Sequence, residues 1–266
     1  MKVRFKNPPI NELAIGVYFD PPLIPFRSEH IGLLWSRLRR EFPKVEQRDP
    51  LSIGVHGHVP PAFGGDGYPH MPRFWFVSDD EVNLVQVQNN AYFLNWRKRE
   101  NEYPHFHEQL KPSFDRNLEM FKQFLREEIK IPEVGIGLCE LTYVDVIESC
   151  EYWRGPQDTS KLIPSFKIPE CGVKNSIAHD FACMYDWEIN SNLHLLTSMR
   201  IAEPRDASDS RRLILEFKAL GQPSGATTSH LNKWYDEAHD AIVSHFLNLT
   251  DKDVQRDFWL LEESSE

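Results

Sequence analysis

Cysteine, long apolar runs and surplus positive charge are all scarce in this chain. Its four cysteines are spread over 266 residues without a CxxC pair, which favours free thiols in a reducing cytosol over a disulfide framework. No apolar run approaches the roughly 20 residues that a membrane helix needs. The net charge of −10 argues against broad affinity for nucleic acid, because phosphate binding needs a basic surface.

Several familiar motifs are also missing. The chain has no phosphate-binding glycine loop, no GxSxG and no HExxH. The N-terminal basic residues are followed by Pro8 and Pro9 before any apolar stretch can form, which is unlike a signal peptide. We therefore predict a cytoplasmic protein with no membrane partner and no cofactor.

Hydrophobic periodicity predicts an alternation of strands and helices. Strands are expected at 13–19, 74–77, 82–96, 134–147, 181–189, 192–201 and 213–220. Residues 74–77 and 82–96 should form an antiparallel hairpin, with Leu84, Gln86 and Gln88 on one face. Apolar residues at helical spacing predict helices at 28–42, 107–129 and 229–249, with a last short helix ending at 258.

The order of these elements favours an α+β fold. Helices return after groups of strands without strict alternation, so an antiparallel sheet with long helices packed on one face is expected. We predict an N-terminal half at 1–147, an irregular connector at 148–180 and a strand-rich C-terminal half with the final helices at 181–266. The sequence leaves open whether the two halves are related strand-helix-strand units.

A loop rich in proline and glycine holds the first candidate site. Its residues 54–74 read GVHGHVPPAFGGDGYPHMPRF, and His56 and His58 can lie on one side of an extended segment. His70 or Asp66 could complete a tetrahedral zinc site, since zinc accepts nitrogen and oxygen ligands. The spacing matches no standard zinc signature, and the prolines and glycines explain the segment as a long turn. The turn is the favoured interpretation, and the metal site is the alternative.

A second candidate site lies at the end of the predicted hairpin. The stretch NWRKRENEY places aromatic residues beside cations, which can stack on bases and contact phosphates or receive an acidic partner. The simpler interpretation is a strand end that passes into solvent. The predicted binding residues of this patch are Trp96, Arg97, Lys98, Arg99 and Tyr103.

Two further groups of histidines are interpreted as structural. His105 and His107 stand at a helix entrance, where two residues are too few for a site. On the last long helix His239 neighbours Asp236 and Asp240, so a carboxylate could polarise its imidazole for general-base work. A half-buried histidine held by a carboxylate explains the same residues, because no nucleophile stands beside it.

Four stretches together resemble one known family. They are NPPINELAIGVYFDP at 7–21, NWRK at 95–98, YPHF at 103–106 and WYDEAHDAIVSHFLNLT at 234–250. They are similar to a sporadically distributed family of uncharacterised bacterial cytoplasmic proteins. The chain departs from it at 141–145, where LTYVD replaces a strand resembling LRYIN. The resemblance implies an accessory role linked to defence or mobile elements.

These observations rank three functions. The first is a non-enzymatic binding or interaction protein of the bacterial cytoplasm, whose partner is a protein or a small ligand. The second is a metal-dependent hydrolase that uses His56, His58 and His70. The third is a module that binds single-stranded nucleic acid through the patch from Trp96 to Arg99. The sequence leaves open whether the protein forms a homo-oligomer.

Overall fold

The computed structural model describes residues 3–50, 71–169, 171–174, 176–202, 210–225 and 227–262. It is an α+β fold that divides into two compact units. The first unit is Ala14–Cys139, and the second combines Met1–Leu13 with Glu140–Glu266. The strands β2 (Ile10–Phe19) and β7 (Ile136–Ile147) contribute residues to both units. The domain boundaries predicted at 147 and 180 stay a prediction.

Within the described residues of the first unit, β3, β4, β5, β6 and parts of β2 and β7 lie side by side in the order β3-β4-β5-β6-β2-β7. Its neighbouring pairs β3–β4, β4–β5 and β5–β6 are antiparallel. The other described strands of this unit are β3 (Lys44–Arg48), β4 (Arg73–Val77), β5 (Asn83–Gln88) and β6 (Ala91–Arg97). Its described helices are α1 (Ile31–Leu38) and α2 (Lys111–Phe124), with the short 3₁₀ helix η1 (Ser28–His30) and the π-helical turns η2 (His105–Leu110) and η3 (Leu125–Ile129).

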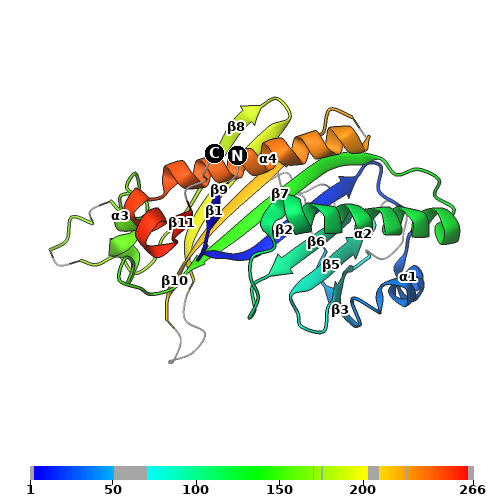
Figure 1. Ribbon diagram of the computed structural model, residues 1–266, viewed down its shortest axis with the longest axis horizontal. Coiled ribbons are helices and arrows are strands. Elements are labelled where there is room, and N and C mark those ends of the chain that lie inside the picture. The colour runs from blue at the N-terminus through cyan, green and yellow to red at the C-terminus, as the bar shows by residue number, and fades with distance from the viewer. Residues whose placement is uncertain are drawn as a thin grey trace. The chain divides into compact units, whose positions relative to one another are not determined.

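Helix α2 covers one face of these strands (Figure 1). The predicted apolar stripe is confirmed, because its members Leu110, Phe114, Leu118, Phe121 and Leu125 are all buried. Phe121 stacks on Tyr92 of β6 with 4.9 Å between ring centroids. Side chains alternate between the two faces of a strand, so the neighbours of Tyr92 along β6 point to the opposite face. That opposite face is where the polar residues of this unit gather.

One expected strand is two strands. The segment 82–96 was predicted to be continuous, but Asn89 and Asn90 form a two-residue turn between β5 and β6. Gln88 pairs with Ala91 at the end of this hairpin. Asparagine suits such turns because it tolerates unusual backbone conformations. The Asn89–Asn90 dipeptide therefore indicated a turn, although the hydrophobic residues on both sides suggested one continuous strand. The expected register of Leu84, Gln86 and Gln88 on one face is confirmed.

The second unit contains strands in the order β2-β7-β10-β9-β8, and α4 packs on β9 and β10 (Figure 1). Strands β8, β9 and β10 pair in antiparallel fashion, while β1 and β11 form a separate two-stranded sheet. The elements are β8 (Ala182–Asn190), β9 (Leu193–Ala202), β10 (Arg212–Gly221), α4 (Thr228–Leu249), η4 (Pro156–Asp158), α3 (Thr159–Leu162), η5 (Val254–Phe258), β1 (Arg4–Phe5) and β11 (Leu261–Glu262).

In each unit a long helix follows a run of described strands. In the first unit β3, β4, β5 and β6 precede η2 and α2, and in the second β8, β9 and β10 precede α4. The segment between β7 and β8 is not merely irregular, because it forms α3 and buries Trp153 completely. The Trp153 Nε1–H donates to the hydroxyl of Thr159 over 3.2 Å.

Among the described residues, no helix is both long and apolar enough to cross a bilayer.

Candidate functional site

The structure separates the members of the predicted aromatic and basic patch. Trp96 is only 2% exposed, because it faces the same side of β6 as Tyr92, toward α2. Its indole meets the ring of Tyr103 edge-on at 5.8 Å. Lys98 and Arg99 are exposed beyond the strand, and Arg97 is half-buried. Trp96 is therefore a core residue rather than a stacking platform, while a binding role for its basic neighbours stays a prediction.

The indole that does lie among cations is Trp75 on β4. Its ring centroid is 4.7 Å from the Arg48 guanidinium carbon, 5.4 Å from that of Arg73 and 6.0 Å from that of Arg97. We call these four residues the arginine–tryptophan cluster. Guanidinium groups at these distances are attracted by the face of an indole ring. The cluster lies entirely within the first unit.

Strand pairing explains why these residues meet. In the β3–β4 register Arg48 is the direct partner of Arg73, and Glu46 is the partner of Trp75. Trp75 is in turn the partner of Gln86 on β5. Directly paired residues of antiparallel strands point to the same face, so this set shares the face opposite α2. The alternation in RFWF already placed Arg73 and Trp75 together, but nothing local indicated Arg48.

A buried amide network holds the centre of the cluster. The side-chain oxygen of Gln86 accepts from Arg73 Nη1 and from the Trp75 indole N–H, each over 3.0 Å. The Gln86 amide nitrogen donates to Asn95 Oδ1 over 2.6 Å. Gln86 and Asn95 are both buried. Because each hydrogen bond limits rotation of the groups it joins, Arg73 and Trp75 are preorganised.

The charges in the cluster oppose one another. Burial lowers the pKa of the Arg73 guanidinium, and the nearby charge of Arg48 lowers it further. Arg48 also forms an ion pair with Glu46. Like charges directly opposite each other on paired strands are destabilising. Glu46 and Asp49 bring opposite charge to this end of β3, so the repulsion between the two guanidinium groups is partly compensated.

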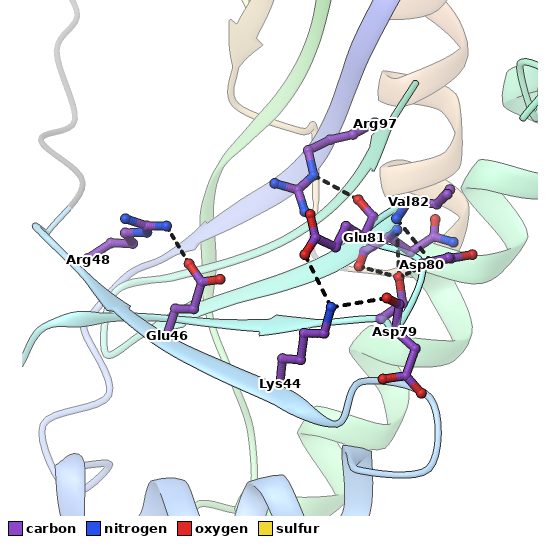
Figure 2. Close-up of polar contacts among 10 residues, drawn as sticks. Lys44, Glu46, Arg48, Asp79, Asp80, Glu81, Val82 and Arg97 are labelled. Atoms are coloured by element: carbon purple, nitrogen blue, oxygen red, sulfur yellow. Dashed lines mark hydrogen bonds and ion pairs between the residues drawn. The ribbon is translucent and has the colours of Figure 1, made fainter. Parts of the chain in front are cut away.

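The third arginine of the cluster, Arg97, lies on β6, and its side chain is hydrogen-bonded to the turn between β4 and β5 (Figure 2). Arg97 Nε donates to the backbone oxygen of Glu81 over 3.1 Å, while the Glu81 carboxylate pairs with Lys44 at 3.1 Å. Glu81 has a positive φ of 60°, a conformation that non-glycine residues adopt infrequently. Asp80 Oδ1 accepts from Ser78 Oγ and Val82 N, and these bonds lower the pKa of Asp80. The turn is thus ordered from both sides and positions the Arg97 side chain.

The predicted metal ligands His56, His58 and His70, with Asp66, lie outside the described residues. Within the part of the chain that the structure describes, no group of three or more His, Cys, Asp or Glu side chains could hold a metal ion. The metal site therefore stays a prediction. Burial raises the pKa of the Cys183 thiol, so this cysteine is less reactive than a free thiol at neutral pH.

The histidine of the last long helix has a phenol as its buried partner. The Tyr143 hydroxyl and His239 Nδ1 are 2.8 Å apart, and both side chains are buried. Two residues along β7, Asp145 is also buried, and burial raises its pKa to about 7. Its Oδ1 has no hydrogen-bond partner among the described residues. Tyr143 and Asp145 both lie on β7, and His239 lies on α4.

A pair of tyrosine substitutions tests this account of the buried polar groups. The Tyr92 hydroxyl is buried without a hydrogen-bond partner in the described chain, and burial raises its pKa. We expect Tyr92→Phe to leave stability unchanged or to raise it by up to about 1 kcal/mol, whereas Tyr143→Phe should cost about 1–2 kcal/mol. Urea unfolding followed by circular dichroism measures both. A larger loss for Tyr92→Phe than for Tyr143→Phe would contradict the assignment.

Comparisons with models of protein families, with curated proteins and with solved structures find no match to this chain. The resemblance based on the stretches at 7–21, 95–98, 103–106 and 234–250 therefore stays a prediction.

Proposed function

We propose that this protein is a non-enzymatic binding protein that recognises an anionic group, a phosphate or a carboxylate, at the arginine–tryptophan cluster. The observation that carries the proposal is the direct pairing of Arg48 with Arg73 beside Trp75. Guanidinium groups bind such anions through paired, parallel N–H donors. A bound anion would offset the repulsion between the two arginines, which gives the paired charges a use.

The preorganised geometry supports binding rather than catalysis. Arg73 and Trp75 are held by Gln86, and Arg97 is held by the backbone of Glu81. Fixed donors lose little conformational entropy when a ligand binds, which favours affinity. The hydrogen bonds described for Arg73, Trp75 and Arg97 engage an amide and a backbone carbonyl, neither of which is a nucleophile or a general base. The accessory cytoplasmic role implied by the family resemblance is compatible with such a protein.

Thermal unfolding in the presence of an anion tests the proposal. We expect sodium pyrophosphate to raise the melting temperature above its value in sodium chloride of equal ionic strength, because a ligand that binds only the folded state stabilises it. Arg73→Gln should abolish this difference. Arg116→Gln is the matched control, since Arg116 is exposed on α2 and its ion pair with Glu41 is long, at 3.7 Å. Calorimetric titration should show at least about tenfold weaker binding for Arg73→Gln than for the control.

The outcome against the proposal is equally specific. If Arg73→Gln and Arg116→Gln respond to pyrophosphate as the unsubstituted protein does, the anion acts through general salt effects and the cluster is not its site. Trp75→Phe provides a second readout, because a ligand beside Trp75 should change tryptophan emission in the unsubstituted protein and not in this variant.

Single-stranded nucleic acid is a second candidate, favoured by an indole among cations. Bases stack on aromatic rings while arginines contact phosphates. Binding of a labelled oligothymidine that weakens with salt and disappears in Arg97→Glu with Lys98→Glu would support this ligand. The acidic chain as a whole disfavours it, because the net charge is −10. The hydrolase alternative requires a metal bound through His56, His58 and His70. Native mass spectrometry would then detect an ion on the unsubstituted protein that is lost in His56→Ala with His58→Ala.

A further inference from the structure

A second surface stands out in the second unit, on strand β8. This strand is the last in the order of its described sheet, and only β9 pairs with it. All but one of its nine residues are exposed. An edge strand presents unpaired backbone N–H and C=O groups that another strand can join.

The edge of β8 is only partly protected. Natural edges are usually blunted by charged side chains, especially lysine, by proline, by bulges or by very short strands. The nine residues of β8, ACMYDWEIN, include no lysine or proline, and the register is irregular only at the end of the strand, between Glu188 and Asn190. Met184 is 68% exposed and Trp187 is 48% exposed. Tyr185 stacks on Trp187 at 6.1 Å, and Trp187 leans on His245 of α4 at 5.9 Å. The apolar ladder is therefore held in place while it remains open to solvent.

The two faces of β8 differ in chemistry. Cys183, Tyr185 and Trp187 point to the face that α4 covers, because their partners on β9 include the buried residues Met199, Thr197 and Leu195. Met184, Asp186 and Glu188 point to the other face, where Asp186 Oδ1 lies 3.1 Å from His194 Nδ1 of β9 and Glu188 is exposed. A strand added along this edge would therefore place apolar residues beside Tyr185 and Trp187, and its alternate residues opposite two carboxylates.

From these observations we propose that β8 binds an extended segment of a partner protein in which lysine or arginine alternates with apolar residues. Backbone hydrogen bonds would supply affinity, and the alternation of side chains would supply specificity. A second copy of this chain fits less well. If two copies of β8 paired in antiparallel fashion with Trp187 opposite Tyr185, Asp186 would lie opposite Asp186. With Trp187 opposite Trp187, Asp186 would lie opposite Glu188. Like charges in direct opposition are destabilising in both registers. This surface is independent of the arginine–tryptophan cluster.

The probe is a labelled peptide, Thr-Val-Lys-Val-Lys-Val-Thr, with binding measured by fluorescence anisotropy on the full chain. We expect saturable binding that is lost when the same residues are ordered Val-Val-Val-Lys-Lys-Thr-Thr. Backbone N-methylation separates strand addition from other modes, because alternate N–H groups point to opposite edges of a strand. Only one of the two sets, the valines or the lysines, should abolish binding when its backbone nitrogens are methylated. Methylation of the other set should preserve binding.

Charge exchange tests the recognition of basic residues. Glu188→Lys should weaken binding of the lysine peptide by about tenfold and strengthen binding of a version with glutamate in place of lysine. Glu237→Lys is the matched control, since it makes the same change on an exposed position of α4 and should leave both affinities unchanged.

Three results would overturn the proposal. The first is no binding at 1 mM peptide, which is about the weakest affinity the measurement resolves. The second is binding that survives both N-methylation patterns or is indifferent to Glu188→Lys. The third is a dimer in sedimentation equilibrium that Trp187→Thr disperses, which would assign the edge to a second copy of the chain. None of these results bears on the anion site, because Arg73 belongs to the other unit.

Discussion

Asparagine in place of Asp145 is expected to stabilise the protein at neutral pH and to leave it nearly unchanged at pH 4. Asp145 is buried on β7, and burial raises its pKa to about 7. Its Oδ1 has no hydrogen-bond partner among the described residues. Ionisation of this carboxyl group is therefore opposed in the folded state and unopposed in the unfolded chain.

The direction of the pH dependence follows from the raised pKa. An unfolded aspartate titrates near 3.9, so between about pH 4 and pH 7 the folded protein holds a proton that the unfolded chain has lost. The free energy of unfolding then falls by about 1.4 kcal/mol per pH unit, a loss on the order of 4 kcal/mol that is complete above the folded pKa. Below the unfolded pKa both states are protonated, and this destabilisation is absent.

Urea unfolding of the unsubstituted protein and of Asp145→Asn at pH 4, 6 and 8 measures this difference. The amide is nearly isosteric and does not ionise, so the variant should lose the pH-dependent fall. Asp79→Asn is the control, because Asp79 is exposed on the turn after β4 and should give no such change. Equal stability of the Asp145→Asn and unsubstituted proteins at pH 8 would refute the account.

Phe121→Ala is expected to cost about 3–5 kcal/mol, the other large effect. Phe121 is fully buried on α2 and packs against Tyr92, Phe26 and Phe19, with ring centroids at 4.9, 5.5 and 6.0 Å. Removing its ring deletes apolar burial and leaves a cavity among side chains that are themselves in contact, so the site cannot easily collapse.

Leu33→Ala is the matched control for Phe121→Ala. Leu33 lies on α1 and is 50% exposed, so its loss should cost less than about 1 kcal/mol. Chemical unfolding of both variants provides the comparison. A cost for Phe121→Ala close to that of Leu33→Ala would show that α2 does not carry the core of the first unit. Because Phe121 faces away from Trp75 by strand alternation, the response of the remaining folded protein to pyrophosphate should be retained.

The cluster and the core of the first unit occupy opposite faces of the same strands. On β6, Tyr92 and Trp96 face α2, while Asn95 joins the amide network that holds Arg73 through Gln86. On β5 and β6 both faces are buried: the face toward α2 is aromatic, and the opposite face combines Leu84 and Phe93 with the hydrogen-bonded Gln86 and Asn95. The arginines lie at the margin of this second face, at the ends of β3 and β6 and at the start of β4.

Elements whose pattern is local could be predicted from the amino-acid sequence. The stripe of α2 at Phe114, Leu118 and Phe121 is buried as its spacing predicted, and α4 extends over Thr228–Leu249, within a residue of the predicted range. Helical periodicity depends on neighbours three and four residues apart, so it can be read from a short window. The alternation of β5 was predicted for the same reason.

Only the tertiary structure decided which polar residues meet. Arg48 lies beside Arg73 because β3 pairs with β4, and β3 was not predicted, since its sequence KVEQR is mostly charged and polar. The choice of Trp75 rather than Trp96 as the indole among the arginines depends on which face of the strands α2 covers. Strand register and the choice of buried face are set by contacts between residues far apart in the chain, which no local pattern records.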